Sequence, residues 1–135
     1  DYPRPPRLEA EARTVVVKLA DGTEVARSTR AMRVLETSHP PTLYVPREDV
    51  NMKLIKEAAR PSSLCEWKGL ATGFSIVGGA KDAGWFYGIT FPEFDSIAKW
   101  LAFYPSKVQC FLDKERVQPQ AGGYYGGWIT KDAGR

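Results

Sequence analysis

The chain has 135 residues, of which 43% are hydrophobic and 26% are charged. This composition is typical of one globular domain and excludes an intrinsically disordered chain. The formal net charge is +3 and the basic residues are scattered along the chain, so we expect no specific nucleic-acid partner.

The first 28 residues predict an extended arm followed by a hairpin. Residues 1–12 form a proline-rich arm, because proline fixes φ and lacks an amide proton. The arm is either a loose tail or a segment that wraps the domain. Residues 13–28 contain two β-branched runs around Asp21 and Gly22. Asp-Gly is a favoured hairpin turn, since glycine adopts positive φ at little cost.

Residues 31–60 predict a strand, an extended segment and a short helical stretch. The run 31–37 is apolar, and prolines bracket the apolar residues 43–45. Proline cannot donate a ladder hydrogen bond, so the second segment belongs at a sheet edge. Residues 47–60 have partial helical spacing, which predicts a short helix or turn before Pro61.

Two apolar segments in the middle of the chain predict a pair of strands. They span residues 64–79 and 84–91, and we expect them to be joined near Gly78 and Gly79. Glycine inside a strand marks a bulge or a close approach of another backbone, which is typical of a site.

The last third of the chain predicts a helix, a hairpin and a tail. In residues 92–105, the apolar positions 94, 97, 98 and 101 have helical spacing. Residues 107–118 return to strand character and turn at Asp113-Lys114, and residues 121–135 are a glycine- and aromatic-rich tail. Residues 1–135 are therefore expected to form a single, mainly β, antiparallel domain of about eight strands with one or two short helices.

Cysteine and histidine are too few for a structural zinc site. The chain has Cys65, Cys110 and one histidine, His39, and no Cys-x-x-Cys pair. Such a site needs four ligands, usually in close pairs, so we expect no metal and no cofactor. A secreted disulfide scaffold would carry more cysteines, and no apolar run approaches the ~20 residues that span a membrane. We therefore expect a cytoplasmic protein without a membrane partner.

A reactive thiol is the first catalytic candidate. Cys65 and His39 would form a thiolate–imidazolium pair if the fold brought them together, and Lys68 would lower the pKa of the thiol further. The competing interpretation is a buried cysteine that packs as a small apolar residue.

A carboxylate at Glu36 is the second catalytic candidate. It lies in an apolar strand, where a carboxylate needs a partner or its pKa rises. A structural ion pair with Arg33, Arg47 or Lys68 is an equally good interpretation of the same position. Asp49 is more simply a helix N-cap. The stretches GGAKDAG and GGYYGG match no phosphate-binding motif and predict turns.

Aromatic residues on or beside predicted strands are the third candidate site. They are Tyr44, Trp67, Trp85, Tyr87, Phe103 and Tyr104. Trp85 and Tyr87 are two positions apart, so they point to the same face of a strand. Phe103 is expected in the core, whereas tryptophan and tyrosine carry polar groups that need partners.

Several ordered motifs resemble one known family. The stretches RVLETSHPPTLYVPREDV, CEWKGLA, GWFY and LAFYPSKV are similar to the family called domain of unknown function 427, which is also labelled nucleotidyltransferase-like. The resemblance covers residues 2–130, and both flanks are similar to those of its longer bacterial members. The motif positions are Glu36, Tyr44, Pro46, Asp49, Cys65, Lys68, Gly69, Trp85, Tyr87, Phe103 and Tyr104.

The resemblance implies a β-tent (Mss4-like) fold, in which two antiparallel sheets pack at a steep angle. Relatives of that fold often bind zinc through cysteine pairs that this chain lacks, and some bind a small or planar ligand between the sheets. Gly88 stands where the family usually has a proline, so we expect that loop to have a different shape. The paired aspartates of polymerase-like transferases are missing, so the residues do not support the transferase label.

The leading functional hypothesis is binding of a small molecule in an aromatic-lined cleft. Lys68 would hold an anionic or carbonyl group, and Glu36 would orient Lys68 or the ligand. The expected ligand-binding residues are Glu36, Tyr44, Trp67, Lys68, Trp85 and Tyr87.

Two alternatives from other classes stay open. One is a thiol or acid–base enzyme that uses Cys65, His39 and Glu36. The other is a protein-interaction module whose terminal segments bind a partner through Tyr125 and Trp128. Whatever its role, we expect the protein to be a monomer or a homodimer. Packing of both segments on their own domain is the competing interpretation of those segments.

Overall fold

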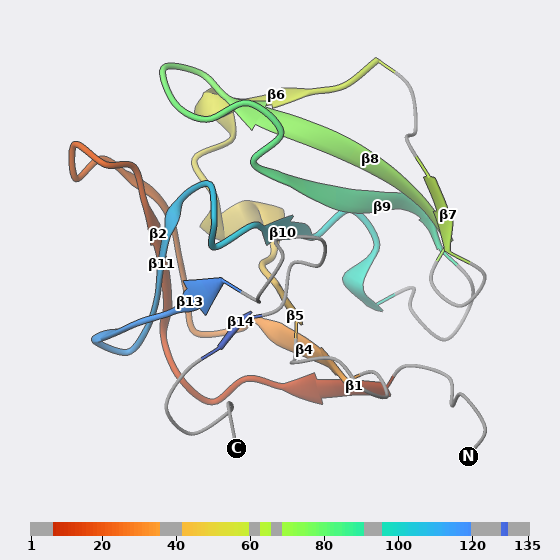
Figure 1. Ribbon diagram of the computed structural model, residues 1–135. Helices are drawn as coiled ribbons and strands as arrows, with labels where there is room; N and C mark the ends of the chain where they lie inside the picture. The colour runs from red at the N-terminus through yellow and green to blue at the C-terminus, as the bar shows by residue number, and fades with distance from the viewer. Residues whose placement is uncertain are drawn as a thin grey trace.

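The computed structural model describes residues 7–35, 42–59, 63–65, 69–90, 96–119 and 128–129. In this part the chain is mainly β, and its strands form three antiparallel sheets and one two-stranded ribbon (Figure 1). The predicted fold class is therefore confirmed. The strands are distributed over three sheets, where the family resemblance implied two.

Each sheet combines segments that lie far apart in the sequence. The three-stranded sheet has the order β1 (Arg7–Ala10), β4 (Met32–Leu35) and β5 (Thr42–Tyr44). The five-stranded sheet has the order β10 (Leu101–Phe103), β9 (Gly84–Thr90), β8 (Gly69–Ile76) and β6 (Ile55–Glu57), and β7 (Ser63–Cys65) also pairs with β8. The four-stranded sheet has the order β12 (Glu115–Arg116), β11 (Gln109–Leu112), β2 (Val15–Lys18) and β3 (Glu24–Ser28). The ribbon pairs β13 (Gln118–Pro119) with β14 (Trp128–Ile129).

The three predicted hairpins are present. β2 and β3 meet at Gly22, whose φ is +91°, and the Asp21 carboxylate accepts a hydrogen bond from the Thr23 amide at 2.8 Å. β8 and β9 are joined through Gly78 and Gly79, and β11 turns into β12 at Asp113, whose φ is +54°. These turns are encoded locally, which is why sequence patterns find them.

The helix predicted over residues 92–105 is wrong in the part that the structure describes. Residues 96 and 97 are in 3-10 conformation, residues 98 and 99 form a turn, and Leu101 begins strand β10. The backbone reverses at Lys99, whose φ is +66°, and the Lys99 amide donates to the Tyr87 carbonyl. Leu101 then exchanges backbone hydrogen bonds of 2.8 and 2.9 Å with Val45. Pairing of Leu101–Phe103 with β9, together with the bridge to Val45, therefore overrides the local helical spacing.

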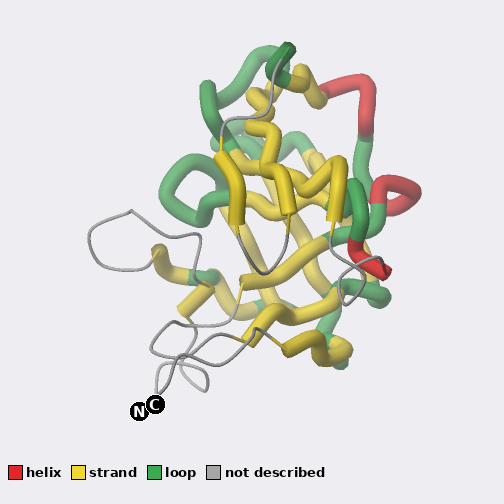
Figure 2. Tube along the Cα trace, turned by 90° about the vertical axis from the view of Figure 1, so that its right-hand side faces the viewer, coloured by secondary structure: helices red, strands yellow, loops and turns green. Residues whose placement is uncertain are grey.

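The helical stretch predicted before Pro61 is two short 3-10 turns, η1 (Arg47–Asp49) and η2 (Met52–Leu54). Asp49 ends η1 and is not its N-cap, which corrects the expectation for this residue. Its carboxylate instead accepts hydrogen bonds from the Ser28 hydroxyl at 2.6 Å and from Arg30 at 3.0 Å. Helical turns lie to one side of the strands (Figure 2), and none in the described part is long and apolar enough to cross a membrane.

Apolar side chains pack on both faces of the five-stranded sheet. Successive side chains of a strand point to opposite faces, so Phe86 enters the main core while Trp85 and Tyr87 contact a second apolar cluster. In the main core, the Phe74 and Phe103 ring centroids lie 5.2 Å apart, and Phe103 is fully buried as predicted. The second cluster packs between this sheet and the three-stranded sheet, from which it takes residues of β4 and β5.

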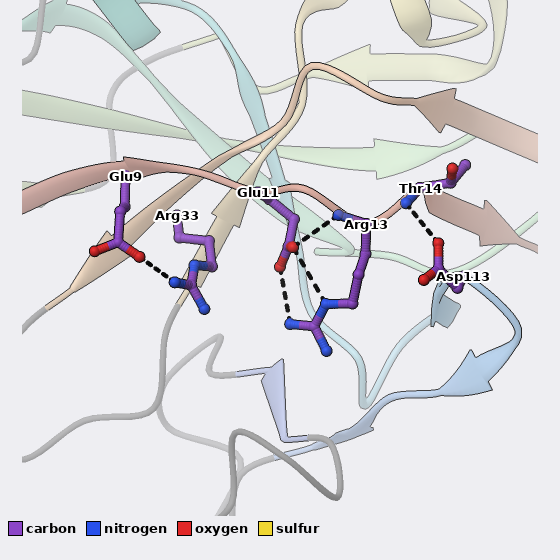
Figure 3. Close-up of polar contacts among 6 residues, drawn as sticks. All are labelled: Glu9, Glu11, Arg13, Thr14, Arg33 and Asp113. Atoms are coloured by element: carbon purple, nitrogen blue, oxygen red, sulfur yellow. Dashed lines mark hydrogen bonds and ion pairs between the residues drawn. The ribbon is translucent and has the colours of Figure 1, made fainter.

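Polar links attach the N-terminal segment to the rest of the fold (Figure 3). Residues 7–10 of the predicted arm form the edge strand β1, and Glu9 pairs with Arg33 across β1 and β4. Glu11 is buried, and its carboxylate accepts hydrogen bonds from the backbone amide and the guanidinium of Arg13, each at 2.9 Å. Residues 1–6, and residues 121–135 apart from 128–129, lie outside the described part.

Candidate functional site

Three of the predicted ligand-binding residues lie together between two sheets. Tyr44 of β5 meets Trp85 of β9 with ring centroids 6.1 Å apart and planes at 88°, and Tyr87 lies 6.2 Å from Tyr44. Tyr104, which follows β10, packs on Trp85 at 4.8 Å. We call these four side chains the aromatic cluster. The indole N–H of Trp85 donates to the Tyr44 hydroxyl at 3.1 Å, which satisfies the polar group of the tryptophan.

Strand geometry brings these rings together. Trp85 and Tyr87 contact the same apolar cluster, as their spacing predicts. Directly opposite Trp85 are Gly73 on β8 and Ala102 on β10. Side chains opposite one another share a sheet face, so the indole ring has a glycine on one side and an alanine on the other. These two small neighbours leave room on that face for a bulky ring.

The aromatic cluster has a buried side and an accessible side. Tyr44 and Tyr87 are 0% and 6% exposed, whereas Trp85 and Tyr104 are half-buried. Burial, with a smaller contribution from the Asp82 carboxylate, raises the pKa of the Tyr104 phenol. Tyr104 therefore keeps its proton at neutral pH and acts as a neutral hydrogen-bonding ring. A ligand would reach the cluster from the side of Trp85 and Tyr104.

A hollow of about 370 Å³ lies on the neighbouring strands β6 and β8 and the loop after β8. It is formed by residues 56–58, 73–76, 79, 81 and 82. Ser75 lies two positions after Gly73 and opposite Lys56, so all three belong to the sheet face that carries Trp85. Gly73 is thus both the cross-strand neighbour of Trp85 and a wall of this hollow, which we call the Gly73 hollow.

Charged groups of both signs surround the Gly73 hollow. Lys56 and Lys81 are exposed, and neither has an ion-pair partner among the described residues. Of the two carboxylates, Glu57 accepts a hydrogen bond from Arg47 at 2.7 Å and is neutralised by it. Asp82 is also a lining residue, and its backbone amide donates to the Ser75 hydroxyl at 3.0 Å. The lining of the hollow therefore contains two unpaired ammonium groups and one unpaired carboxylate.

A second hollow, of about 340 Å³, lies on the outer face of the four-stranded sheet. Its floor contains Val16 and Phe111, and Lys18 and Lys114 are among its walls. Lys18 lies 5.9 Å from the Phe111 ring centroid, a weak cation–π contact. This hollow contains an aromatic ring and lysines but does not include residues of the aromatic cluster. Substitutions in it are therefore matched controls for substitutions in the Gly73 hollow.

The remaining predicted site residues are not tested by the structure. Glu36, His39, Trp67 and Lys68 lie outside the described residues, and Cys65 is described only as the backbone of β7. The geometry between these groups therefore stays a prediction.

Two of the cations considered as partners of Glu36 have other partners. Arg33 pairs with Glu9, and Arg47 pairs with Glu57 and lies over the Phe86 ring at 4.6 Å. The buried carboxylate that the structure does describe is Glu11, which the sequence interpretation assigned to the arm.

Cysteine chemistry and metal binding have no described site. Cys110 is fully buried in the main core, and burial raises the pKa of its thiol strongly. No group of three or more histidine, cysteine or acidic side chains that would hold a metal ion occurs among the described residues.

The sequence interpretation missed Gly73, Ser75, Lys56 and Lys81. The available signal was the glycine at position 73, in the interior of a predicted strand. The register that places it opposite Trp85 was not predictable from spacing, because it depends on the number of residues in the loop between β8 and β9.

Comparison with known proteins agrees with the motifs. No curated protein matches the chain. The family described as domain of unknown function (DUF427) matches residues 7–114, which is most of the chain and includes the aromatic cluster and the Gly73 hollow. The protein therefore belongs to the DUF427 family.

Proposed function

We propose that this protein binds a small planar molecule at the accessible side of the aromatic cluster. The observation that carries the proposal is the pair of half-buried rings, Trp85 and Tyr104, with Gly73, a wall of an open hollow, directly opposite Trp85. An aromatic ligand gains favourable contact area against such rings at low entropic cost, because their own orientation is already fixed.

The buried side of the cluster supports this role by holding Trp85 in place. The indole N–H is bound to the Tyr44 hydroxyl, and Tyr44 itself is completely buried. A ring that is held by a hydrogen bond and by its neighbours need not be ordered when a ligand arrives. Binding sites with this property lose less free energy on association.

The proposal keeps the sequence-based roles of Lys68 and Glu36. Lys68 directly precedes β8, the strand that carries Gly73, and would hold an anionic or carbonyl group of the ligand. Glu36 directly follows β4, which contributes Val34 to the apolar cluster behind the aromatic rings. Trp67 would add a further wall to the site.

Thermal unfolding in the presence of a metabolite library tests this proposal. We expect at least one planar compound to raise the melting temperature of the wild-type protein and to quench its tryptophan fluorescence. Trp85→Ala and Lys68→Ala should remove or reduce that shift, whereas Phe111→Ala, in the second hollow, should leave it unchanged. The proposal fails if no compound shifts the melting temperature, or if the hits are insensitive to Trp85→Ala.

A further inference from the structure

We infer that the Gly73 hollow receives a single anionic group of an aromatic ligand whose ring lies against Trp85 and Tyr104. This inference rests on the proposed function and specifies its ligand class. It assigns binding roles to Lys56, Ser75 and Lys81, which come from β6, β8 and the loop after β8.

The first argument is the continuity of one sheet face. Trp85, Gly73 and Ser75 lie on the same face of the five-stranded sheet, and Gly73 stands between the indole and the hollow. A ligand in contact with Trp85 can therefore extend over Gly73 without crossing a side chain.

The second argument is that packing does not require glycine at position 73. A Cβ atom built there would meet only the Gly84 carbonyl oxygen, at the ordinary contact distance of 3.7 Å. Gly73 does not have a positive φ angle, so its backbone conformation is one that other residues also adopt. The missing side chain leaves an open space beside Trp85, as a bound group would need.

The third argument is electrostatic. Lys56 and Lys81 have no ion-pair partner among the described residues and approach the hollow from two different elements. The Ser75 hydroxyl accepts the Asp82 amide, so its own proton is available to donate to an anion. The two lysines and one unpaired carboxylate, Asp82, leave a single net positive charge in the lining, so a group with one negative charge is favoured over a highly charged one.

Two fluorescent probes with the same ring system separate the ring contact from the charge. 8-Anilinonaphthalene-1-sulfonate carries one sulfonate, and N-phenyl-1-naphthylamine is its neutral counterpart. We expect both to bind the wild-type protein. The double variant Lys56→Gln/Lys81→Gln should weaken binding of the sulfonate about five- to tenfold, as expected for the loss of two exposed ion pairs. It should leave binding of the neutral probe unchanged.

Two sets of variants complete the experiment. Lys18→Gln/Lys114→Gln removes the same amount of charge from the second hollow and should not weaken binding of the sulfonate probe. Gly73→Val places a β-branched side chain in the hollow, and a strand tolerates such a residue. This substitution should weaken binding of both probes, and Gly73→Ala should weaken it less. The melting temperature of each variant, measured without probe, establishes that it is folded.

The outcomes separate the inference from the proposed function. If neither probe binds, and the metabolite library also gives no hit, both fail. In a second outcome, both probes bind in a way that depends on Trp85, while Lys56→Gln/Lys81→Gln weakens the binding of both equally or of neither. That result overturns only the assignment of the anionic group to the Gly73 hollow. The assignment is also overturned if Lys18→Gln/Lys114→Gln weakens sulfonate binding as much as Lys56→Gln/Lys81→Gln does. The loss of affinity would then reflect the net charge of the protein and not a specific site.

Discussion

The indole N–H of Trp85 donates a hydrogen bond of 3.1 Å to the hydroxyl of Tyr44, and so links the five-stranded sheet to the three-stranded sheet. The same two sheets are joined through the backbone by Val45 and Leu101. A side-chain and a main-chain link therefore fix the position of β5 against β9 and β10. The orientation of the aromatic cluster depends on both links.

Removing the Tyr44 hydroxyl tests the energetic importance of this contact. We expect Tyr44→Phe to lower the free energy of unfolding by about 1–2 kcal/mol, because the indole N–H of Trp85 loses its acceptor in a half-buried place. Urea unfolding followed by tryptophan fluorescence measures the change.

Tyr104→Phe is the matched control for that measurement. The Tyr104 ring packs on Trp85, but its hydroxyl has no hydrogen-bond partner among the described residues. Its removal should therefore change the free energy of unfolding by less than about 0.5 kcal/mol. Equal effects of the two substitutions would contradict a specific role for the Trp85–Tyr44 hydrogen bond.

Two glycines of β9 should respond very differently to the same substitution. A Cβ atom at Gly84 would lie 2.0 Å from the Ala102 carbonyl oxygen and 2.6 Å from Phe74, so Gly84→Ala must displace a paired strand. We expect a loss of at least about 3 kcal/mol in the free energy of unfolding, or failure to fold. At Gly88 the nearest atom would be 3.7 Å away, in Phe86, so Gly88→Ala should be nearly neutral. Calorimetric melting of both variants gives the comparison, and similar melting temperatures would show that β9 and β10 are not packed this closely.

The buried carboxylate of Glu11 should make stability depend on pH in acid. Burial alone would raise its pKa, but the hydrogen bonds and charge of Arg13, with a further contribution from Arg33, outweigh burial and lower the pKa below 4.5. A group whose pKa is lowered by folding contributes stability at pH values above its unfolded pKa and loses it as the pH falls through its folded pKa. Glu11 therefore stabilises the protein at neutral pH and contributes to its unfolding in acid.

Substitution of Glu11 checks this sign. Glu11→Gln should lower the free energy of unfolding at pH 7 by about 1–2 kcal/mol and flatten its decline between about pH 5 and pH 2. Glu48→Gln is the control, because Glu48 pairs with Arg30 at 3.3 Å in an exposed position, where an ion pair contributes little. Urea unfolding at a series of pH values measures both. An unchanged pH slope for Glu11→Gln would be inconsistent with the lowered pKa.

Thiol labelling distinguishes the two cysteines and tests the enzyme hypothesis. Cys110 is fully buried and burial raises its pKa, so in a Cys65→Ser variant no thiol should react with a disulfide reagent until the protein unfolds. In the Cys110→Ser variant, iodoacetamide reaction across pH reports on Cys65 alone. Reaction of Cys65 only above about pH 8 would identify an ordinary thiol and count against a thiolate–imidazolium pair with His39. Rapid labelling of the native Cys65→Ser variant would contradict the burial of Cys110.

Patterns within one strand or turn were predictable from the sequence. The two-residue spacing of Trp85 and Tyr87 predicts a shared face, and both contact the same apolar cluster. The turns at Gly22 and Asp113 follow from residue types that adopt positive φ. Family membership was also readable, because its motifs are ordered along the chain. The period of a strand and the chemistry of a turn are properties of adjacent residues, so the amino-acid order alone determines them.

Contacts between distant strands were decided by the tertiary structure. Leu101 has helical spacing with its neighbours but forms a strand, because β10 pairs with β9 opposite Phe86 and Val45 adds a further bridge. Gly73 becomes part of a candidate site only because the register places it opposite Trp85. Which segments pair, and in which register, depends on the free energy of packing whole sheets together, and no local pattern contains that information.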